Sequence, residues 1–338
     1  MEAQPLHFIL CSDVDPDGRN VCDVTYDIPI PDLEWKGVEW VVPELCVFLR
    51  QLEEKHDVSF KVTWFVRSDL QMNHVYGNPC WPRKEFAGIW DNAMSQGHEI
   101  GWHPHFWRLD EKAGEWYQEM FDRKWMDKCL KTGFSSFKDG FKPPRCIRTG
   151  WDYMDSDIMR CLDELEVAAD LSSLPGLSHL GNPCGRNRVR GSYNWKGGCD
   201  RVYHPTRDDY LNPGQDHLKI FEIPVTTVSP PLVKKGSNRF MSKYAAGVRD
   251  RLKGEKIPMH LDVNPELFKH ILDTGYKRSS GKYARPVVCY FHPSDLLVKD
   301  AMATAEKNLE YAVAVMERTG GEGATVSRYL DLLCGSIQ

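Results

Sequence analysis

Short apolar segments alternate with amphipathic ones along most of this chain, and this alternation is the strongest constraint on its fold. Residues 7–12 and 58–66 are rich in the apolar, β-branched and aromatic side chains that favour strands. Residues 41–55, which lie between them, space their apolar side chains at helical intervals. Repeated strand–helix units of this kind predict a mostly parallel sheet covered by helices, either open or closed into a barrel.

The alternation continues toward the C-terminal end of the chain. Asp155 precedes one amphipathic segment and is a candidate helix N-cap, whereas Gly97 and Gly133 follow two others as stop signals. We therefore expect further strands at 99–105, 146–148, 167–170, 220–227 and 286–292, and helices at 84–96, 111–132, 156–165, 265–275 and 300–318.

The region of about residues 171–218 departs from this pattern. It contains many Gly, Pro, Asn and Ser residues and has little periodicity. Because long loops inside compact domains are usually functional, we interpret it as a candidate lid or substrate loop, the alternative being a plain irregular excursion. The sequence has no internal repeat and no obvious linker, so we predict a single domain spanning residues 1–338.

Charge and composition limit the partners and the compartment. The chain has 43 Lys and Arg against 48 Asp and Glu, a formal charge of −5, so it lacks the basic field that favours nucleic acid. Its start has no basic segment before an apolar run, and no stretch approaches the roughly 18–20 apolar residues of a membrane helix. Its 11 cysteines are scattered without a C-x-x-C pair, which favours reduced thiols. We expect a cytoplasmic protein without nucleic-acid partners, and no protein partner is indicated.

Two pairs of polar residues stand where predicted strands end. His103 and His105 are two residues apart, so in extended chain both imidazoles point to one face and can reach one ion. Asp13 and Asp15 have the same spacing, and two such carboxylates repel each other unless a cation or an arginine lies near. Either pair alone fits solvated or core residues equally well. Together, at the common carboxyl edge of a parallel sheet, two histidines and a carboxylate are typical of a hydrolytic metal site.

Three more chemistry-bearing residues end predicted strands at the same edge. They are Arg148, Asp170 and His292. Arg148 is suited to hold a carboxylate, and Asp170 is suited to orient a histidine. For Arg148 and Asp170, taken singly, a structural ion pair is the more common explanation.

Five segments, in this order, resemble the motifs of the polysaccharide deacetylases, the NodB-homology carbohydrate esterases. Residues 62–66 and 221–225 also resemble strands of that family, so the resemblance covers roughly residues 6–300. The order and spacing of the five segments carry the resemblance, and they are 12–15, 97–105, 148–151, 170–172 and 290–293.

The resemblance implies a distorted (β/α) barrel with fewer than eight regular units and one divalent metal ion on an Asp-His-His triad. Carried onto this sequence, the metal ligands are Asp15, His103 and His105. The usual second histidine lies four residues after the first, but that position is Trp107, which leaves His105 as the nearby ligand. Zinc is the expected metal, with cobalt, manganese or nickel as alternatives.

The resemblance also implies catalytic roles. Asp13 corresponds to the general base, Arg148 to the residue that holds Asp13, and His292, steadied by Asp170, to the general acid. The family places its two aspartates next to each other, whereas Val14 separates them here, so the roles of Asp13 and Asp15 are open to exchange.

The implied reaction is metal-dependent removal of an N-acyl group, acetyl or formyl, from an amino sugar or sugar conjugate. An allantoinase-like hydrolase of cyclic amides on the same barrel and a non-catalytic sugar-binding protein are the alternatives. Amidohydrolase barrels carry His-x-His on their first strand, and 2-His-1-carboxylate iron oxygenases are β-sandwiches, so both fit less well. The nearby aromatic residues either wall a ring-shaped substrate or pack in the core, and they are Trp102, Trp107, Trp151 and Tyr153.

Overall fold

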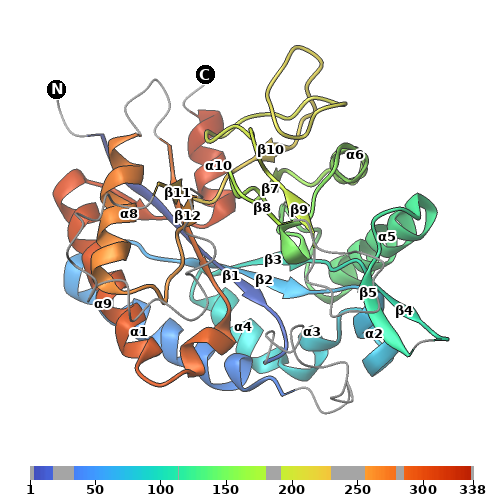
Figure 1. Cartoon of the computed structure of the whole chain (residues 1–338). Helices are drawn as coiled ribbons and strands as arrows, with labels where there is room; N and C mark the ends of the chain where they lie inside the picture. Colours follow the sequence, from blue (N-terminus) through green and yellow to red (C-terminus); the bar gives the residue numbers. More distant parts are fainter. Residues whose placement is uncertain are drawn as a thin grey trace, which may run out of the picture.

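A curled parallel sheet surrounded by helices forms the centre of the molecule (Figure 1). The computed structural model describes residues 4–17, 34–112, 114–179, 192–229, 256–278 and 285–335. Its hydrogen-bonded path runs β10-β7-β6-β3-β2-β1-β13, and every pair along it is parallel. The strands on this path are β1 (His7–Val14), β2 (Val62–Arg67), β3 (Glu99–His103), β6 (Cys146–Ile147), β7 (Ala169–Asp170), β10 (Phe221–Glu222) and β13 (Val287–Phe291).

The two edges of the sheet approach each other. Thr226, four residues past the end of β10, donates its backbone N–H to the carbonyl of Val288 in β13 at 3.1 Å. The segment 259–261 lies on β13 as well, where Leu261 donates to Tyr290 at 3.0 Å. A further strand, β14 (Glu322–Gly323), pairs with the start of β1. The predicted distorted barrel, with irregular chain closing its gap, is therefore confirmed.

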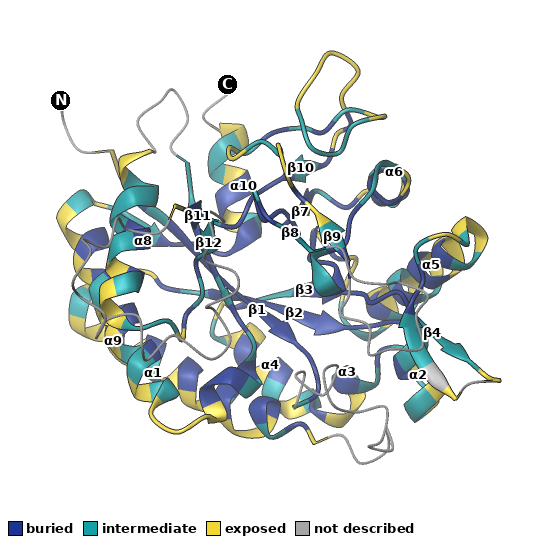
Figure 2. Cartoon of the chain, viewed as in Figure 1, coloured by how far each residue is buried: buried dark blue, intermediate teal, exposed yellow. Residues whose placement is uncertain are grey.

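Helices cover the outer face of the sheet, and their apolar sides are the buried ones (Figure 2). The strands are buried almost throughout, as in β2, because parallel sheets with helices outside are covered on both faces. The helices are α1 (Val42–His56), α2 (Leu70–Tyr76), α3 (Trp81–Glu85), α4 (Ala87–Ser95), α5 (Arg123–Gly140), α6 (Ser156–Glu164), α8 (Pro265–Lys277), α9 (Ala301–Thr319) and α10 (Val326–Gly335), with short helical turns at Gly37–Val41, Gly150–Asp152 and Pro293–Leu297.

The helix predicted at 111–132 is wrong in its first half. Residues Trp107–Asp110 (β4) and Glu115–Gln118 (β5) form an antiparallel hairpin that projects beside α2 and α5 (Figure 1). The Glu119 carboxylate then accepts three successive backbone N–H groups, from residues 120–122, and so stops a helix from forming there. Helix α5 begins only after Asp122, whose side chain caps it, and Gly133 lies inside it rather than at its end.

Other elements differ less from the sequence-based expectation. The helix expected at 84–96 is divided at Phe86, and the strand expected at 220–227 is reduced to β10 and β11 (Thr227–Val228), the latter paired with β12 (Ile257–Pro258). The irregular region 171–218 contains β8 (Ser178–His179) and β9 (Tyr193–Asn194), and its residues 180–191 lie outside the described segments. Asp155 caps α6 as predicted, accepting the N–H groups of Asp157 and Ile158.

Two compositional expectations can be compared with the described segments. Every cysteine within them has a free thiol. None of the helices in those segments has the length and apolar character needed to cross a lipid bilayer.

Candidate metal and catalytic site

The ends of β1 and β3 place their polar residues at the same edge of the sheet. Both strands pair in parallel with β2, so the chain following each one leaves the sheet on the same side. Asp13 lies near the end of β1 and Asp15 just beyond it, while His103 ends β3 and His105 follows two residues later. All four residues are buried.

Three of these side chains converge on one point. One ligand atom each from Asp15, His103 and His105 lies within 4.8 Å of the others. Asp15 Oδ2 is 3.4 Å from His103 Nε2, Asp15 Oδ1 is 3.2 Å from His105 Nε2, and the two Nε2 atoms are 3.1 Å apart. Ligand atoms of a tetrahedral zinc ion lie roughly 3.3–3.5 Å from one another. The spacing of the Asp15 carboxylate oxygens and the two Nε2 atoms therefore fits one small divalent cation.

The surroundings of the two imidazoles aim their Nε2 atoms at this point. His103 Nδ1 lies 2.6 Å from the carbonyl oxygen of Arg148, so it donates its proton there and directs Nε2 toward the other two side chains. The ring of His105 lies directly on Gly150, where an added Cβ would collide with the ring atoms. Burial, followed by the charge of Arg67, lowers the pKa of His105 to about 4, so its imidazole is neutral. Neutral, oriented imidazoles are the form in which histidine binds a metal.

Asp15 carries negative charge even without a cation. Burial raises the pKa of its carboxyl group, but His105 and His103 more than offset this, so the pKa is well below the ordinary value. Burial also lowers the pKa of His103, but the negative charges of Asp13 and Asp15 outweigh burial, so the pKa of His103 is above its ordinary value. Arg67 Nη1 lies 3.2 Å from Asp15 Oδ1 and so fixes the carboxylate from the side.

Asp13 is held by Arg148, as expected from the sequence. Arg148 Nε donates to Asp13 Oδ2 at 2.8 Å, and both side chains are buried. Burial raises the pKa of Asp13, but Arg148, then His103 and His292, bring it below the ordinary value. Asp13 Oδ1 has no hydrogen-bond partner within the described part of the chain. An ionised, oriented carboxylate with one free buried oxygen is suited to accept a proton.

His292 lies on the other side of Asp13. Its Nε2 is 3.8 Å from Asp13 Oδ2 and 3.9 Å from Asp15 Oδ2. The expectation that Asp170 steadies this histidine is wrong, because the carboxylate beside His292 Nδ1 is that of Asp295, at 3.5 Å. Asp295 also accepts the backbone N–H of His292 at 3.0 Å.

Asp170 has a different environment. It accepts a hydrogen bond from Ser172 at 2.7 Å, and the Ser172 hydroxyl in turn accepts the backbone N–H of Thr149 at 2.9 Å. Burial raises the pKa of Asp170, and burial together with the charge of Asp170 raises the pKa of Glu222, its register partner on β10. Asp170 therefore supports the segment after β6 that carries Arg148.

The nearby aromatic residues divide into two groups. Trp102 and Tyr153 are buried, and their polar atoms bond to Ser68 and Asp155, so they belong to the core. Trp107 stacks on His105 at 6.3 Å between ring centroids. Trp151 in turn meets Trp107 edge-on, at 6.2 Å between ring centroids. Trp151 has φ 60°, a left-handed backbone conformation that a bulky residue adopts only under constraint. These two tryptophans form an aromatic wall beside the ligand triad.

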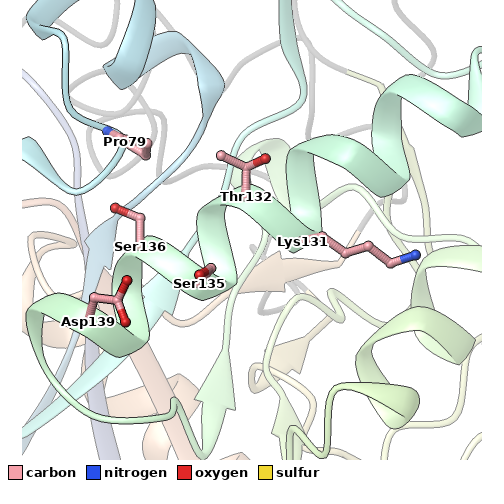
Figure 3. A pocket seen from close by; sticks show the side chains of 6 residues that line it. All are labelled: Pro79, Lys131, Thr132, Ser135, Ser136 and Asp139. Atoms are coloured by element: carbon pink, nitrogen blue, oxygen red, sulfur yellow. The ribbon is translucent and has the colours of Figure 1, made fainter.

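A separate hollow lies on the outside of α5 (Figure 3). It has a volume of about 480 Å³ and shares no residue with the triad. None of its lining residues is buried and they form no titratable cluster, so the triad and not the hollow is the candidate site. The lining residues are Pro79, Lys131, Thr132, Ser135, Ser136 and Asp139.

Several residues at the site were not identified from the sequence. Arg67 ends β2 and Asp69 lies two residues beyond it, at the same edge, and Asp69 accepts the N–H of His105 at 3.2 Å. Their place at a strand end, like that of the histidines, is the signal that could have identified them. Asp295 stands three residues after His292, within reach across one helical turn. Glu222 is paired with Asp170 by the register of β10 on β7, which no local pattern reveals.

Comparison with known proteins supports the fold. The chain matches no protein-family model, and no curated protein sequence matches it significantly. A "putative polysaccharide deacetylase" from Mycobacterium smegmatis matches over 100% of this chain and 96% of its own, with 14% identity and a TM-score of 0.54. A "putative glycoside hydrolase/deacetylase" from Parabacteroides distasonis matches over 99% and 72%, with 12% identity and a TM-score of 0.58. The chain thus has a polysaccharide deacetylase-like fold.

Proposed function

We propose that this protein is a metal-dependent hydrolase of the polysaccharide deacetylase type, which removes an N-acyl group from an amino sugar or sugar conjugate. The observation that carries the proposal is the buried convergence of Asp15, His103 and His105 beside an ionised Asp13. The deacetylase-like fold and the five sequence segments that resemble that family support the same conclusion.

In this proposal each residue of the chain has a defined role. A divalent cation on the triad would polarise the acyl carbonyl and acidify water. Asp13, kept ionised by Arg148, accepts the proton of the attacking water on its free Oδ1. His292 donates a proton to the leaving nitrogen, since expulsion of an amine anion is strongly unfavourable. His292 Nε2 lies 3.8 Å from Asp13 Oδ2, so the proposed base and acid are close enough to act on one acyl group.

The aromatic wall supports a ring-shaped substrate. Trp151, which is partly exposed beside the buried Trp107, offers an apolar face near the triad, and sugar rings pack on such faces through their C–H groups. A small acyl group, acetyl or formyl, suits a site whose ligands are all buried. We propose zinc as the metal, with cobalt, manganese or nickel able to occupy the same ligands.

The proposal is tested with metal-stripped, zinc-reconstituted protein and a panel of N-acetylated and N-formylated amino sugars, with cyclic amides included. We expect release of acetate or formate, reduced about 10²–10⁴-fold in Asp13→Asn, as for loss of a general base. Asp13→Asn should keep its zinc, whereas His105→Ala should lose it, and the exposed Asp331→Asn is the matched control.

Two results would change the conclusion. Hydrolysis of a cyclic amide alone would replace the substrate class while retaining the mechanism. Full zinc content in both His103→Ala and His105→Ala would contradict the ligand triad itself.

A further inference from the structure

A second group of metal-ligating side chains lies beside the first. One ligand atom each from His260, His292 and Asp295 lies within 4.8 Å of the others. The segment 259–261 runs parallel to β13 and pairs His260 with Tyr290, while His292 follows two residues later in extended conformation. Tyr290 and His292 are two residues apart and therefore share a face, and His260 lies opposite Tyr290 in the neighbouring segment. The imidazoles of His260 and His292 therefore point to the same side. Asp295 comes from the helical turn directly after β13.

The contacts of His260 prepare it as a ligand. The Asp262 carboxylate hydrogen-bonds to His260 Nδ1, which leaves Nε2 facing Asp295 Oδ2 at 3.4 Å. A carboxylate behind the non-ligating nitrogen is the usual support of a metal-binding histidine, because it fixes the ring and makes the other nitrogen more basic. The side chains of His260 and His292 are each 13% exposed, so an ion from solvent can reach them.

His292 belongs to both groups through different atoms. Its Nδ1 lies 3.5 Å from the same Asp295 oxygen that His260 faces, whereas its Nε2 points toward Asp13 and Asp15. A ligand set of two imidazole nitrogens and one carboxylate, with further positions left for water, is suited to zinc or cobalt.

We propose that His260, His292 and Asp295 form a second divalent-cation site, adjacent to the triad. As the general acid, His292 carries a proton on each ring nitrogen and becomes neutral imidazole when it gives up the Nε2 proton. A cation on Nδ1 takes the place of the second proton, so that loss of the Nε2 proton would leave an imidazolate anion, and the ring no longer acts as an acid. Filling the second site therefore inhibits the enzyme at high metal concentration. The site itself follows from the geometry, and only its inhibitory effect rests on the proposed function.

Metal stoichiometry tests the site independently of activity. The metal-stripped full chain is dialysed against increasing Zn²⁺, and against Co²⁺ with its visible absorption recorded. We expect two ions per wild-type chain at saturation, and one in His260→Gln and in His105→Ala. Asp262→Asn, a milder change at a partly exposed residue, should weaken the second site about 10–100-fold. His56→Gln, a surface histidine paired with Glu317, is the matched control and should bind two ions.

The effect on turnover is measured on the same samples. Wild-type activity should rise with the first equivalent of zinc and fall at least fivefold as the second site fills, whereas His260→Gln should keep its maximal rate. One ion per wild-type chain, or two in a folded His260→Gln variant, would overturn the second site. Two ions without hydrolysis of any substrate would leave the site standing and contradict the proposed function instead.

Discussion

Arg67 joins buried acidic groups that come from separate parts of the chain. Its guanidinium contacts Asp15 at 3.2 Å and Asp69 at 2.8 Å, and its side chain is only 5% exposed. The pairing fixes one oxygen of the metal-ligating Asp15, while Asp69 holds the backbone of His105. A single side chain thus stabilises two of the three ligand positions without being a ligand itself.

Removal of this arginine should be costly. In Arg67→Ala the buried carboxylates lose their counterion, and breaking such a pair lowers the free energy of unfolding by about 3–5 kcal/mol. Urea unfolding of the metal-free wild type and of Arg67→Ala measures this loss in free energy of unfolding. Arg50→Ala, which removes an exposed pair with Glu54, should change stability by less than about 0.5 kcal/mol. Equal effects of the two substitutions would show that Arg67 does not support the site.

His98 is a buried histidine that serves the fold rather than the site. It lies at the start of β3, and its Nδ1 accepts the backbone N–H of Val62 at 3.0 Å. Burial, followed by the charge of Lys61, lowers its pKa from 6.5 to about 4. The unfolded chain therefore binds a proton at a higher pH than the folded one. The contribution of neutral His98 to the stability of the fold is therefore complete above pH about 6.5 and is lost as the pH falls toward 4.

A substitution that cannot be protonated isolates this contribution. In His98→Asn the introduced amide oxygen is able to accept the same N–H, but the amide takes up no proton. Between pH 7 and pH 5 we expect the variant to lose about 2 kcal/mol less stability than the wild type, at about 1.4 kcal/mol per pH unit below 6.5. Urea unfolding with a chelator present, at both pH values, makes the comparison. Identical losses in the two proteins would contradict the argument.

At the level of elements, a glycine sets how closely α5 approaches the sheet. A Cβ on Gly133 would lie 2.6 Å from the backbone oxygen of Ser68 and 3.0 Å from the Trp102 ring. The helix therefore packs on the chain after β2, where Arg67 and Asp69 stand. Helix propensity alone would favour alanine at this position by about 1 kcal/mol.

Two glycine substitutions separate packing from propensity. Gly133→Ala should destabilise the protein by about 1–3 kcal/mol, because backbone cannot move aside as a side chain can. Gly88→Ala, in α4, meets nothing within 4 Å and should be neutral or stabilising by up to about 1 kcal/mol. Thermal unfolding of the two variants compares them directly. A stabilised Gly133→Ala would mean that α5 is free to shift outward.

Much of the element order could be predicted from the sequence, because apolar periodicity records which faces are buried. The strand that carries His103, expected over 99–105 and found over Glu99–His103, and the cap at Asp155 depend on local patterns of this kind. The hairpin at 107–118 could not be predicted from helical periodicity, since it is held by the pairing of its own two strands and is followed by Glu119, whose carboxylate accepts three backbone N–H groups. The partner of Asp170 could not be predicted either, because sheet register, and not sequence distance, places Glu222 opposite it.

For the whole molecule, the candidate site exists only when the barrel is assembled. Asp13 and His292 are 279 positions apart in the chain, and they meet because β13 pairs directly with β1. His103 arrives through β2, which separates β3 from β1. An unfolded chain cannot present these groups together, so a cation bound to the triad binds the folded state selectively. Its binding free energy then adds to the stability of the whole fold.

Zinc should therefore raise the melting temperature, and the rise should grow with the logarithm of the zinc concentration once this exceeds the dissociation constant. At about 100 times the dissociation constant of the triad, the gain is about 2.7 kcal/mol, equivalent to roughly 4 °C. Asp15→Asn removes the ligand that both histidines face and should abolish most of this shift, whereas Asp331→Asn should retain it. Melting curves of each variant, recorded with zinc and with a chelator, give its zinc-induced shift in melting temperature. A full zinc-induced shift in Asp15→Asn would mean that the stabilising ion binds elsewhere. An effect of the substitution on the unfolded state cannot imitate this result, because such an effect does not make the melting temperature rise with zinc concentration.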